Sequence, residues 1–433
     1  MLLRVAPHVI RPLRFVMPYH VGLRPRWMLR LGLFLYDHLG WNITLPPTAS
    51  IDLKHDPVGA ALKPEFVFAF EYSDCAADDS RLVILNAVDA RARGARIAPR
   101  TRCVSAERQG TQWNLTLEAV GTLACENVSA RVLVNAAGPW VDEVSRRVVH
   151  TNARPKVRLD KGSHIVVRRL FDHDRAYIFQ NADGRIVFAI PYQQDFTLIG
   201  TTEQIYAGDP ASVKIGENEI DYLCAAASEY FRMPVRRDGV VWTYSGVRPL
   251  YDDGASSAQK VSRDYVFELD APKGQAPLLI VYGGKLTTYR RLAEAALARL
   301  APHIGKRTSW TATAPLPGGD VPPGGMQEVI DSLRRDYPFL ARPHLERLGR
   351  AYGTRARVIL NGARGAHDLG RCFGGDLTEA EIRYLIAEEW AETAADILWR
   401  RSKLGLRFNP EDVASLEKFL AEMRSGSANA SRP

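Results

Sequence analysis

The sequence predicts an α/β layer in its first third, a largely antiparallel sheet in its middle and an all-helical C-terminal region. Residues 80–94 carry apolar side chains at helical spacing and are followed by short apolar strands, which is typical of an α/β layer. Between about 160 and 270, apolar runs alternate with tight-turn residues, as in an antiparallel sheet. Beyond residue 326 the apolar residues recur at helical spacing. At 433 residues the chain is long enough for two or three domains.

The individual elements follow from the same patterns. The predicted helix over 80–94 ends at Gly94, and Asp183-Gly184 between two apolar runs predicts a hairpin turn. Strands are predicted near residues 96–104, 112–119, 131–138 (a buried strand), 164–167, 177–180, 186–190 and 196–200. Residues 315–325 contain too much proline and glycine for a helix or a sheet and predict a linker. The tail 425–433 is small and polar, so we expect it to be disordered.

Composition narrows the class of protein. The net charge of +8 and the pI near 9.2 favour anionic substrates, lipid head groups or nucleic acid. The sequence has no basic run and no aromatic RNA-binding motif, so we expect no nucleic-acid partner. The five cysteines include no Cys-x-x-Cys pair, and no His, Cys or Asp spacing is typical of a metal site. No apolar run approaches the ~18 residues of a membrane span, and no secretion signal is evident, so we expect a cytoplasmic protein.

A basic, aromatic-rich stretch over residues 24–36 has two interpretations. Its arginines (Arg24, Arg26 and Arg30) are set against apolar residues at helical spacing (Trp27, Leu31, Phe34 and Leu35). Such a helix can lie on a bilayer surface. It can equally pack on the protein core and keep its arginines in solvent.

The segment over 278–290 predicts a ligand site. An apolar strand runs through Gly283 and Gly284 directly into a helix start. The glycines let a ligand approach the backbone, and the first N–H groups of a helix attract an anion. A second apolar strand ends at Gly138, followed by a proline that suits the first turn of a helix. At both places a plain strand-to-helix turn is the alternative.

Arg248, Arg263 and His164 are the polar residues that could carry chemistry. Arg248 lies among glycine, proline and apolar residues, and Arg263 precedes the next strand. Two guanidinium groups suit a phosphate or carboxylate, whereas salt bridges to nearby aspartates (Asp252, Asp253 or Asp264) are the alternative. His164 begins an apolar strand, where a structural histidine is common, but histidine also titrates near working pH and can act as a base.

Five segments now suggest a family. They are Phe70-Glu-Tyr-Ser-Asp-Cys75, Asn135-Ala-Ala-Gly-Pro-Trp140, Lys161-Gly-Ser-His-Ile-Val166, Tyr244-Ser-Gly-Val-Arg-Pro-Leu250 and Gly283-Gly-Lys-Leu-Thr-Thr-Tyr-Arg290. With Glu389-Trp390 and Leu398-Trp-Arg-Arg401, they make the chain similar to the FAD-dependent sn-glycerol-3-phosphate dehydrogenases of the aerobic bacterial type, over residues 1 to 424. The resemblance implies oxidation of sn-glycerol 3-phosphate to dihydroxyacetone phosphate, with hydride passed to FAD and electrons to quinone. It also implies a homodimer attached peripherally to the inner face of the cell membrane.

The resemblance implies a glutathione-reductase-like fold of the D-amino-acid-oxidase type, with interleaved domains. These are an FAD-binding domain (66–150 and 277–308), a substrate-binding domain with an antiparallel sheet (1–65 and 151–276), a linker (309–326) and a helical C-terminal domain (327–424). Carried over residue by residue, it implies that the flavin is bordered by Gly138, Gly283, Gly284, Lys285, Leu286 and Thr287. It further implies that Arg248 and Arg263 hold phosphate. His164 would act as general base, and Lys285 would stabilise the alkoxide or the reduced flavin.

One departure from the family matters. The family opens with a βαβ unit whose glycine-rich turn binds the FAD pyrophosphate, and no Gly-x-Gly-x-x-Gly follows a strand here. We therefore expect an N-terminally incomplete FAD domain, a chain that does not hold FAD by itself, and strands 132–134 and 279–281 without a neighbour. One alternative is an inactive fragment that serves only in phosphate-ligand binding or subunit interaction. Another is a glycerol-3-phosphate oxidase that uses oxygen.

Overall fold

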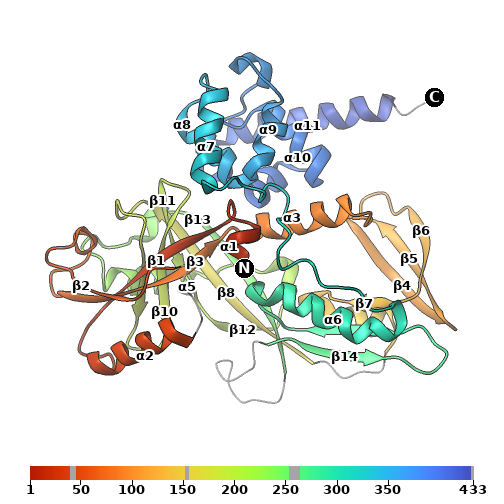
Figure 1. Ribbon diagram of the computed structural model, residues 1–433, viewed down its shortest axis with the longest axis horizontal. Helices are drawn as coiled ribbons and strands as arrows, with labels where there is room; N and C mark the ends of the chain where they lie inside the picture. The colour runs from red at the N-terminus through yellow and green to blue at the C-terminus, as the bar shows by residue number, and fades with distance from the viewer. Residues whose placement is uncertain (40–44, 152–155, 253–263, 431–433) are drawn as a thin grey trace. The chain divides into compact units, whose positions relative to one another are not determined.

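The structure, a computed structural model, describes residues 1–39, 45–151, 156–252 and 264–430 (Figure 1). The chain forms two compact units. Unit 1 comprises Met1–Leu13, Asp74–Pro99 and Trp310–Pro433, and unit 2 comprises Arg14–Ser73 and Arg100–Ser309. The boundaries of the FAD-binding and substrate-binding domains remain predictions.

Unit 2 is built on a large mixed sheet (Figure 1). Among the described residues its strand order is β12-β8-β11-β10-β9-β1-β3-β2, and β13 also pairs with β8. The strands are β1 (Ile10–Pro18), β2 (Ala49–Asp52), β3 (Phe68–Ala77), β8 (Val157–Arg168), β9 (Ala176–Gln180), β10 (Ile186–Tyr192), β11 (Phe196–Gly200), β12 (Gln204–Tyr206) and β13 (Val240–Tyr251). The neighbours of β8 and the β9–β10 hairpin are antiparallel, which confirms the predicted sheet.

Alternation along β8 decides which residues can form a site. Side chains two apart on a strand share a face, so Lys161 and Ser163 point to one side, and Gly162 and His164 to the other. Helix α5 (Glu217–Ser228) packs against β8, and its Glu219 lies 2.5 Å from the Lys161 ammonium. The α5 side of β8 is therefore occupied by protein, and the side that carries His164 is the candidate ligand face.

Two smaller sheets complete unit 2. In the first, β15 (Leu278–Tyr282) lies between β14 (Val266–Asp270), which is antiparallel, and β7 (Leu133–Asn135), which is parallel. The second contains β4 (Thr101–Gln109), β5 (Gln112–Ala119) and β6 (Cys125–Ala130), all antiparallel. Helices α4 (Val141–Glu143) and α6 (Tyr289–Ile304) follow β7 and β15. All five side chains of β15 are buried, so the expectation that 279–281 would lack a neighbour is wrong, whereas β7 is an edge strand of this sheet and its Val134 is exposed.

Most of the basic, aromatic-rich stretch over residues 24–36 forms helix α2 (Arg26–Leu39). It is anchored by Tyr36, whose hydroxyl donates to the Ser73 carbonyl over 3.1 Å, and by Arg26, whose guanidinium lies 4.5 Å from the Phe68 ring centre. Its apolar residues are nevertheless exposed: Trp27, Leu31, Phe34 and Leu35. The structure therefore does not show a helix that packs these apolar residues on the protein core. In the part of the chain that is described, no helix is long and apolar enough to cross a membrane.

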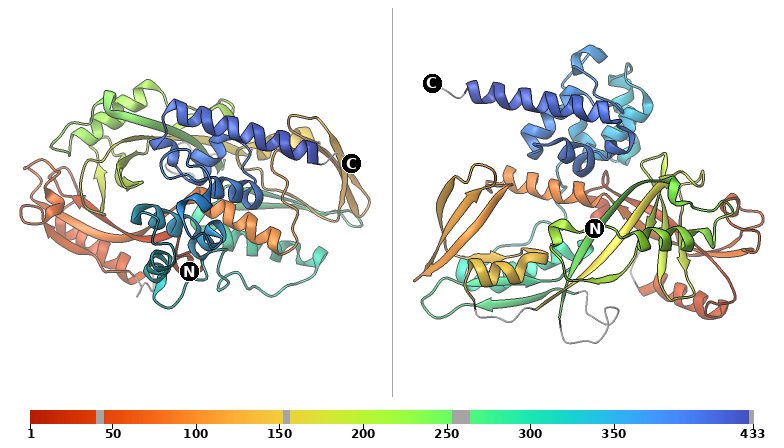
Figure 2. Two further views of the ribbon diagram at one scale, coloured as in Figure 1. Left: turned by 90° about the horizontal axis from the view of Figure 1, so that it is seen from above. Right: turned by 180° about the vertical axis from the view of Figure 1, so that it is seen from behind.

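Unit 1 is helical, as predicted for the C-terminal region. Its helices are α1 (Leu2–Val5), α3 (Asp79–Ala92), α7 (Gly325–Asp336), α8 (Arg342–Tyr352), α9 (Ala356–Leu360), α10 (Glu379–Glu389) and α11 (Pro410–Ala430), and Figure 2 shows α11 as the long blue helix. Leu333, Leu385 and Leu416 lie in one apolar core. Arg81 of α3 and Glu389 of α10 form a fully buried ion pair, with Nη2 2.8 Å from Oε1.

Some sequence-based boundaries are wrong. The buried strand predicted at 131–138 has three residues, and Val134 is exposed; the Asn135 side chain ends it by accepting from the Ala137 amide over 3.3 Å. The strand predicted near 96–104 begins only at Thr101, after Arg100 at a φ of 52°. Helix α11 continues to Ala430, into the tail for which the sequence predicts disorder. Serine, glycine and asparagine cost a helix only about 1 kcal/mol each or less, and no proline intervenes.

Candidate active site

His164 and Arg248 lie on one face of the β8–β13 ladder. The antiparallel register pairs His164 with Tyr244, Gly162 with Gly246, and Asp160 with Arg248. Successive pairs on this face are about 7 Å apart along the strand. The middle pair consists of glycines: the space beside Gly246 is open, whereas the Arg248 guanidinium and Thr201 lie over Gly162. The ladder therefore provides a surface with a histidine at one end and an arginine at the other.

The histidine is held in a fixed position. Its ring stacks on Tyr244 with centroids 4.9 Å apart and 4° between the planes. On its other side lies Gly200, where a Cβ would meet His164 Cδ2 at 2.1 Å, so no larger residue fits there. Nδ1 is buried and has no hydrogen-bond partner among the described residues. Burial and the charge of Arg248 lower the pKa of His164 to about 4.

A neutral His164 can accept a proton at pH 7. The pKa of His164 therefore lies below the working pH that the sequence-based reason assumed, and its role as a base stays a prediction. A base that is already deprotonated is available over the whole physiological range.

Arg248 has one described ion-pair partner, which differs from the aspartates considered above. Its Nη1 lies 3.1 Å from Oδ2 of the buried Asp160, whereas the guanidinium side chain is 37% exposed. The guanidinium lies over Gly162, because a Cβ on that glycine would approach Nη2 at 3.2 Å and Nη1 at 3.3 Å. The exposed part of the guanidinium is available to an anion that sits on the ladder between Arg248 and His164.

Two glycine turns lie at the carboxyl ends of the parallel strands β7 and β15. Gly138 has a φ of 55° and begins a short turn (Gly138–Trp140), while Gly283 and Gly284 have φ values of 67° and 103°. A Cβ on Gly138 would touch no atom within 4 Å, so its backbone is open. In α/β sheets ligands bind beyond the carboxyl ends of the strands, where close approach to the backbone needs glycine. The backbone of these glycine turns is suited to contact one side of a bound dinucleotide.

The turn after β15 brings Lys285 toward the same region. A Cβ on Gly283 would lie 3.7 Å from the carbonyl oxygen of Pro249, the residue after Arg248, and β13 contacts both the Gly138 turn and β15. Lys285 precedes the turn Leu286–Thr288, where Leu286 is 40% exposed, and its Nζ lies 3.5 Å from Asp264. Thus these elements meet in one region. They carry Gly138, Gly283, Gly284, Thr287, Lys285, Arg248 and His164. Arg263 lies outside the described residues.

Sequence reasoning missed Asp160, Gly162, Gly200 and Tyr244. One signal was available, because counting back in twos along the strand from His164 reaches Gly162 and Asp160. No signal in the sequence pairs Asp160 with Arg248, which is 88 residues away.

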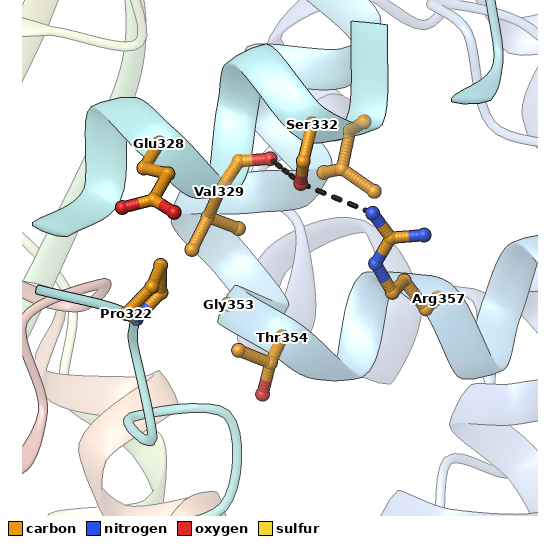
Figure 3. A pocket seen from close by; sticks show the side chains of 8 residues that line it. Pro322, Glu328, Val329, Ser332, Gly353, Thr354 and Arg357 are labelled. Carbon is orange, nitrogen blue, oxygen red and sulfur yellow. Dashed lines mark hydrogen bonds between the residues drawn. The ribbon is translucent and has the colours of Figure 1, made fainter. Parts of the chain in front are cut away.

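A cavity of about 200 Å³ in unit 1 contains none of the predicted site residues (Figure 3). It is lined by Pro322, Glu328, Val329, Ser332, Leu333, Gly353, Thr354 and Arg357. The Arg357 guanidinium donates to Ser332 Oγ over 3.0 Å and pairs with Asp336, so its charge is already balanced. The described residues also contain no cluster of three or more His, Cys, Asp or Glu side chains suited to a metal ion.

Glycine turns at the ends of parallel strands, beside a neutral histidine and an arginine, fit the class of oxidoreductases that use a dinucleotide. The comparisons with known proteins agree. The family model of the FAD-dependent oxidoreductases matches residues 4–290, and that of the C-terminal domain of alpha-glycerophosphate oxidase matches residues 309–426.

Three curated relatives cover nearly all of the chain. D-erythritol 1-phosphate dehydrogenase of Brucella abortus is 47% identical over 96% of this chain and 83% of the relative. Glycerol-3-phosphate dehydrogenase of Pseudomonas aeruginosa is 47% identical, over 97% and 81%. Aerobic glycerol-3-phosphate dehydrogenase of Escherichia coli is 44% identical, over 97% and 83%. The structure of glycerol-3-phosphate dehydrogenase from Bacillus halodurans, complexed with FAD, is 25% identical with a TM-score of 0.75, covering 98% of this chain and 80% of that one.

The chain therefore belongs to the FAD-dependent glycerol-3-phosphate dehydrogenase family, as the sequence predicts. The predicted fold class, cofactor and enzyme class are confirmed with it.

Proposed function

We propose that this protein oxidises sn-glycerol 3-phosphate to dihydroxyacetone phosphate with FAD as the hydride acceptor. One observation carries the proposal: His164 and Arg248 share the face of the β8–β13 ladder, separated by the glycine pair 162 and 246. The Arg248 guanidinium reaches back over Gly162, one step of about 7 Å along the strand from His164, which is roughly the length of a three-carbon phosphate ester. A phosphate on Arg248 then places the C2 hydroxyl near His164.

The protein residues have separate tasks in this reaction. Arg248, with Arg263 as a predicted second contact, binds the phosphate through charge-assisted hydrogen bonds. His164 accepts the hydroxyl proton, and Lys285 stabilises the negative charge that develops on that oxygen. FAD, when bound against Gly138 and the turn after β15, supplies the hydride acceptor. The closely packed Gly200 and Tyr244 keep the imidazole from rotating away from the substrate.

Erythritol 1-phosphate is a second candidate substrate. The relative named for it is 47% identical to this chain, the same as the glycerol-3-phosphate dehydrogenase of Pseudomonas aeruginosa. Both compounds present a phosphate and a secondary hydroxyl, and the one with four carbons needs more room beyond His164. The ratio of kcat/KM for the two substrates distinguishes them.

For the electron acceptor we propose quinone, in glycerol catabolism, at the inner face of the cell membrane, with the protein as a homodimer. The exposed apolar face of α2 supports the membrane location, because a basic amphipathic helix lies in a bilayer interface. Oxygen is the alternative acceptor. Hydrogen peroxide formed in step with substrate oxidation would identify an oxidase, whereas reduction of a soluble quinone without peroxide supports the dehydrogenase.

The proposed reaction is tested with the full chain supplied with FAD. We expect bleaching of the flavin absorbance when sn-glycerol 3-phosphate is added anaerobically, and no bleaching with glycerol. Flavin that is bound but stays oxidised with every polyol phosphate tested would refute the proposal, whereas flavin that does not bind would bear out the expected incomplete FAD domain.

A further inference from the structure

The α5 side of β8 carries a buried ion pair that the proposed reaction does not use. Lys161 and Glu219 are 9% and 3% exposed, and the ammonium lies 2.5 Å from Glu219 Oε2. The same carboxylate accepts a hydrogen bond from the Thr202 hydroxyl over 2.6 Å and another from the Gly216 amide over 2.7 Å. Such a pair adds little net stability compared with apolar side chains of the same size, but it fixes the groups that it binds.

The buried Thr202 ties the chain to β8 where the regular ladder is interrupted. Strand β11 pairs with β8 as far as Gly200, which lies opposite His164, and β12 resumes the pairing at Gln204. Between these strands Thr202 binds Ser163 twice. Its amide donates to the Ser163 carbonyl over 3.2 Å, and its hydroxyl accepts from the Ser163 amide over 3.0 Å. The segment after β11 is thereby fixed to β8 across the interruption.

This fixed segment contacts the ligand face of β8. Gly200 lies against the His164 ring, because a Cβ there would meet Cδ2 at 2.1 Å, and the next residue, Thr201, lies over Gly162. The Thr202 side chain points the other way, toward α5, where it donates to the buried carboxylate. Neighbouring residues of one short segment therefore contact opposite faces of β8. A hydrogen bond on the α5 side thus sets how closely the backbone packs on the imidazole.

We propose, building on the proposed function, that Thr202, held by the buried ion pair, is a positioning residue for His164. Without the Thr202 hydroxyl, Gly200 can move away from the imidazole, which leaves only Tyr244 to hold the ring. A displacement of about 1 Å from the reacting hydroxyl is enough to slow a proton transfer severely. The phosphate contact at Arg248 is unchanged, so the rate of the reaction falls while the affinity for substrate is kept.

The test uses three threonine variants of the full chain. Thr202→Val keeps the shape of the side chain without the hydroxyl, and Thr202→Ser keeps the hydroxyl without the methyl group. Thr197→Val is the matched control, because Thr197 is fully buried on β11 and its hydroxyl accepts from the Leu170 amide over 3.1 Å. Both valine variants remove a buried hydroxyl that a backbone N–H binds. An effect confined to Thr202→Val therefore reports on positioning rather than on stability.

The first measurement is the titration of the His164 ring, which needs no flavin and decides the inference even for a chain that holds none. It is followed by NMR of histidines labelled at the ring Cε1 carbon, with His164→Asn to assign the signal. Burial and then the charge of Arg248 lower the pKa of His164 to about 4, so the wild-type signal should stay constant between pH 8 and 6. In Thr202→Val we expect this pKa to rise toward the ordinary value of 6.5, so that the signal moves within that range.

The other groups near the ring are the same in all three threonine variants. Arg248 and Tyr244 face it from β13, and Lys161 and Glu219 lie on the other side of β8. A rise in the pKa of His164 therefore reports lost burial of the ring. Thr202→Ser and Thr197→Val should titrate as the wild type does.

The second measurement is single-turnover reduction of the flavin by sn-glycerol 3-phosphate in the chain supplied with FAD. Thr202→Val should lower the maximal rate at least about fivefold, with less than about a twofold change in the substrate concentration that gives half of it. Thr202→Ser should restore the rate to within about twofold of the wild type, because the hydroxyl that binds the carboxylate is back.

A His164 titration that is the same in Thr202→Val and the wild type overturns the inference, and so does an equal change in Thr197→Val. A Thr202→Val variant whose substrate affinity falls as much as its rate also overturns it, because the hydroxyl then supports the whole site. A shifted titration in a protein that binds flavin but oxidises no polyol phosphate refutes the proposed function and leaves Thr202 as the residue that holds the ring. Oxidation at the full rate by Thr202→Val does the reverse.

Discussion

The rate of flavin reduction should stay constant as the pH falls from 8 to 6. The reason is the state of His164, whose pKa is lowered to about 4, first by burial and then by Arg248. A substrate phosphate cancels part of the Arg248 charge but leaves the burial in place. The base therefore stays deprotonated in the complex over this range, so acidification from pH 8 to 6 should not slow the reaction.

The alternative is an ordinary histidine, and the two cases differ measurably. With a pKa near 4, roughly 1% of the ring is protonated at pH 6, so the rate changes by about 1%. With the ordinary pKa of 6.5, roughly three quarters is protonated at pH 6, and the rate falls about fourfold. A fourfold effect is well above the error of a rapid-mixing measurement.

The assay is single-turnover reduction of the flavin in the reconstituted protein at saturating sn-glycerol 3-phosphate. His164→Asn should reduce this rate by about 10²-fold or more, the usual contribution of a positioned base. His55→Asn, which changes an exposed histidine paired with Asp52, should leave it unchanged. A fourfold loss centred near pH 6.5, or an unaffected His164→Asn, would show that His164 is not a buried neutral base.

Further predictions follow from individual residues. Arg248→Ala should raise KM for sn-glycerol 3-phosphate at least ~10-fold, about 1.4 kcal/mol of lost phosphate binding, and an unchanged KM contradicts this. Gly200→Ala should lower kcat, because the new methyl group meets the His164 ring. Burial lowers the pKa of His8 in unit 1 to about 3. Below pH 6.5 the unfolded state therefore binds a proton that the native state does not bind, which favours unfolding. His8 should therefore lower the free energy of unfolding by about 2 kcal/mol between pH 8 and 5, and His8→Asn should reduce the measured loss by that amount in calorimetric unfolding. Binding to anionic vesicles should weaken with salt, and more steeply without Arg24, Arg26 and Arg30; equal binding to neutral vesicles argues against membrane attachment.

The features that could be read from the sequence were those encoded locally. Gly184 at a φ of 80° forms the predicted hairpin turn, and Gly283 and Gly284 take the left-handed backbone that a strand-to-helix ligand turn needs. Turns of this kind depend on a few neighbouring residues, and glycine marks them. The helical C-terminal region could be predicted for the same reason, since its periodicity lies within each helix.

What could not be predicted depends on register and on burial. The Asp160–Arg248 pair exists because β8 and β13 align at one offset out of several, and no nearby residue specifies that offset. The low pKa of His164 arises first from burial, in a place where Tyr244 and Gly200 of other strands enclose the ring, and then from the charge of Arg248. The exposure of Trp27 on α2 also depends on what the rest of the fold leaves uncovered.

The buried Arg81–Glu389 pair has a consequence for how the chain is made. The two residues are 308 positions apart in the sequence, and ribosomes add about 5–20 residues per second, so they emerge roughly 15–60 s apart. An unpaired guanidinium cannot be buried without a large cost, so Arg81 must remain in water during that interval. Helix α3 therefore packs in its final position only when synthesis is nearly complete. In a chain that ends before residue 389, α3 would lack the carboxylate that pairs with Arg81 when the helix is buried.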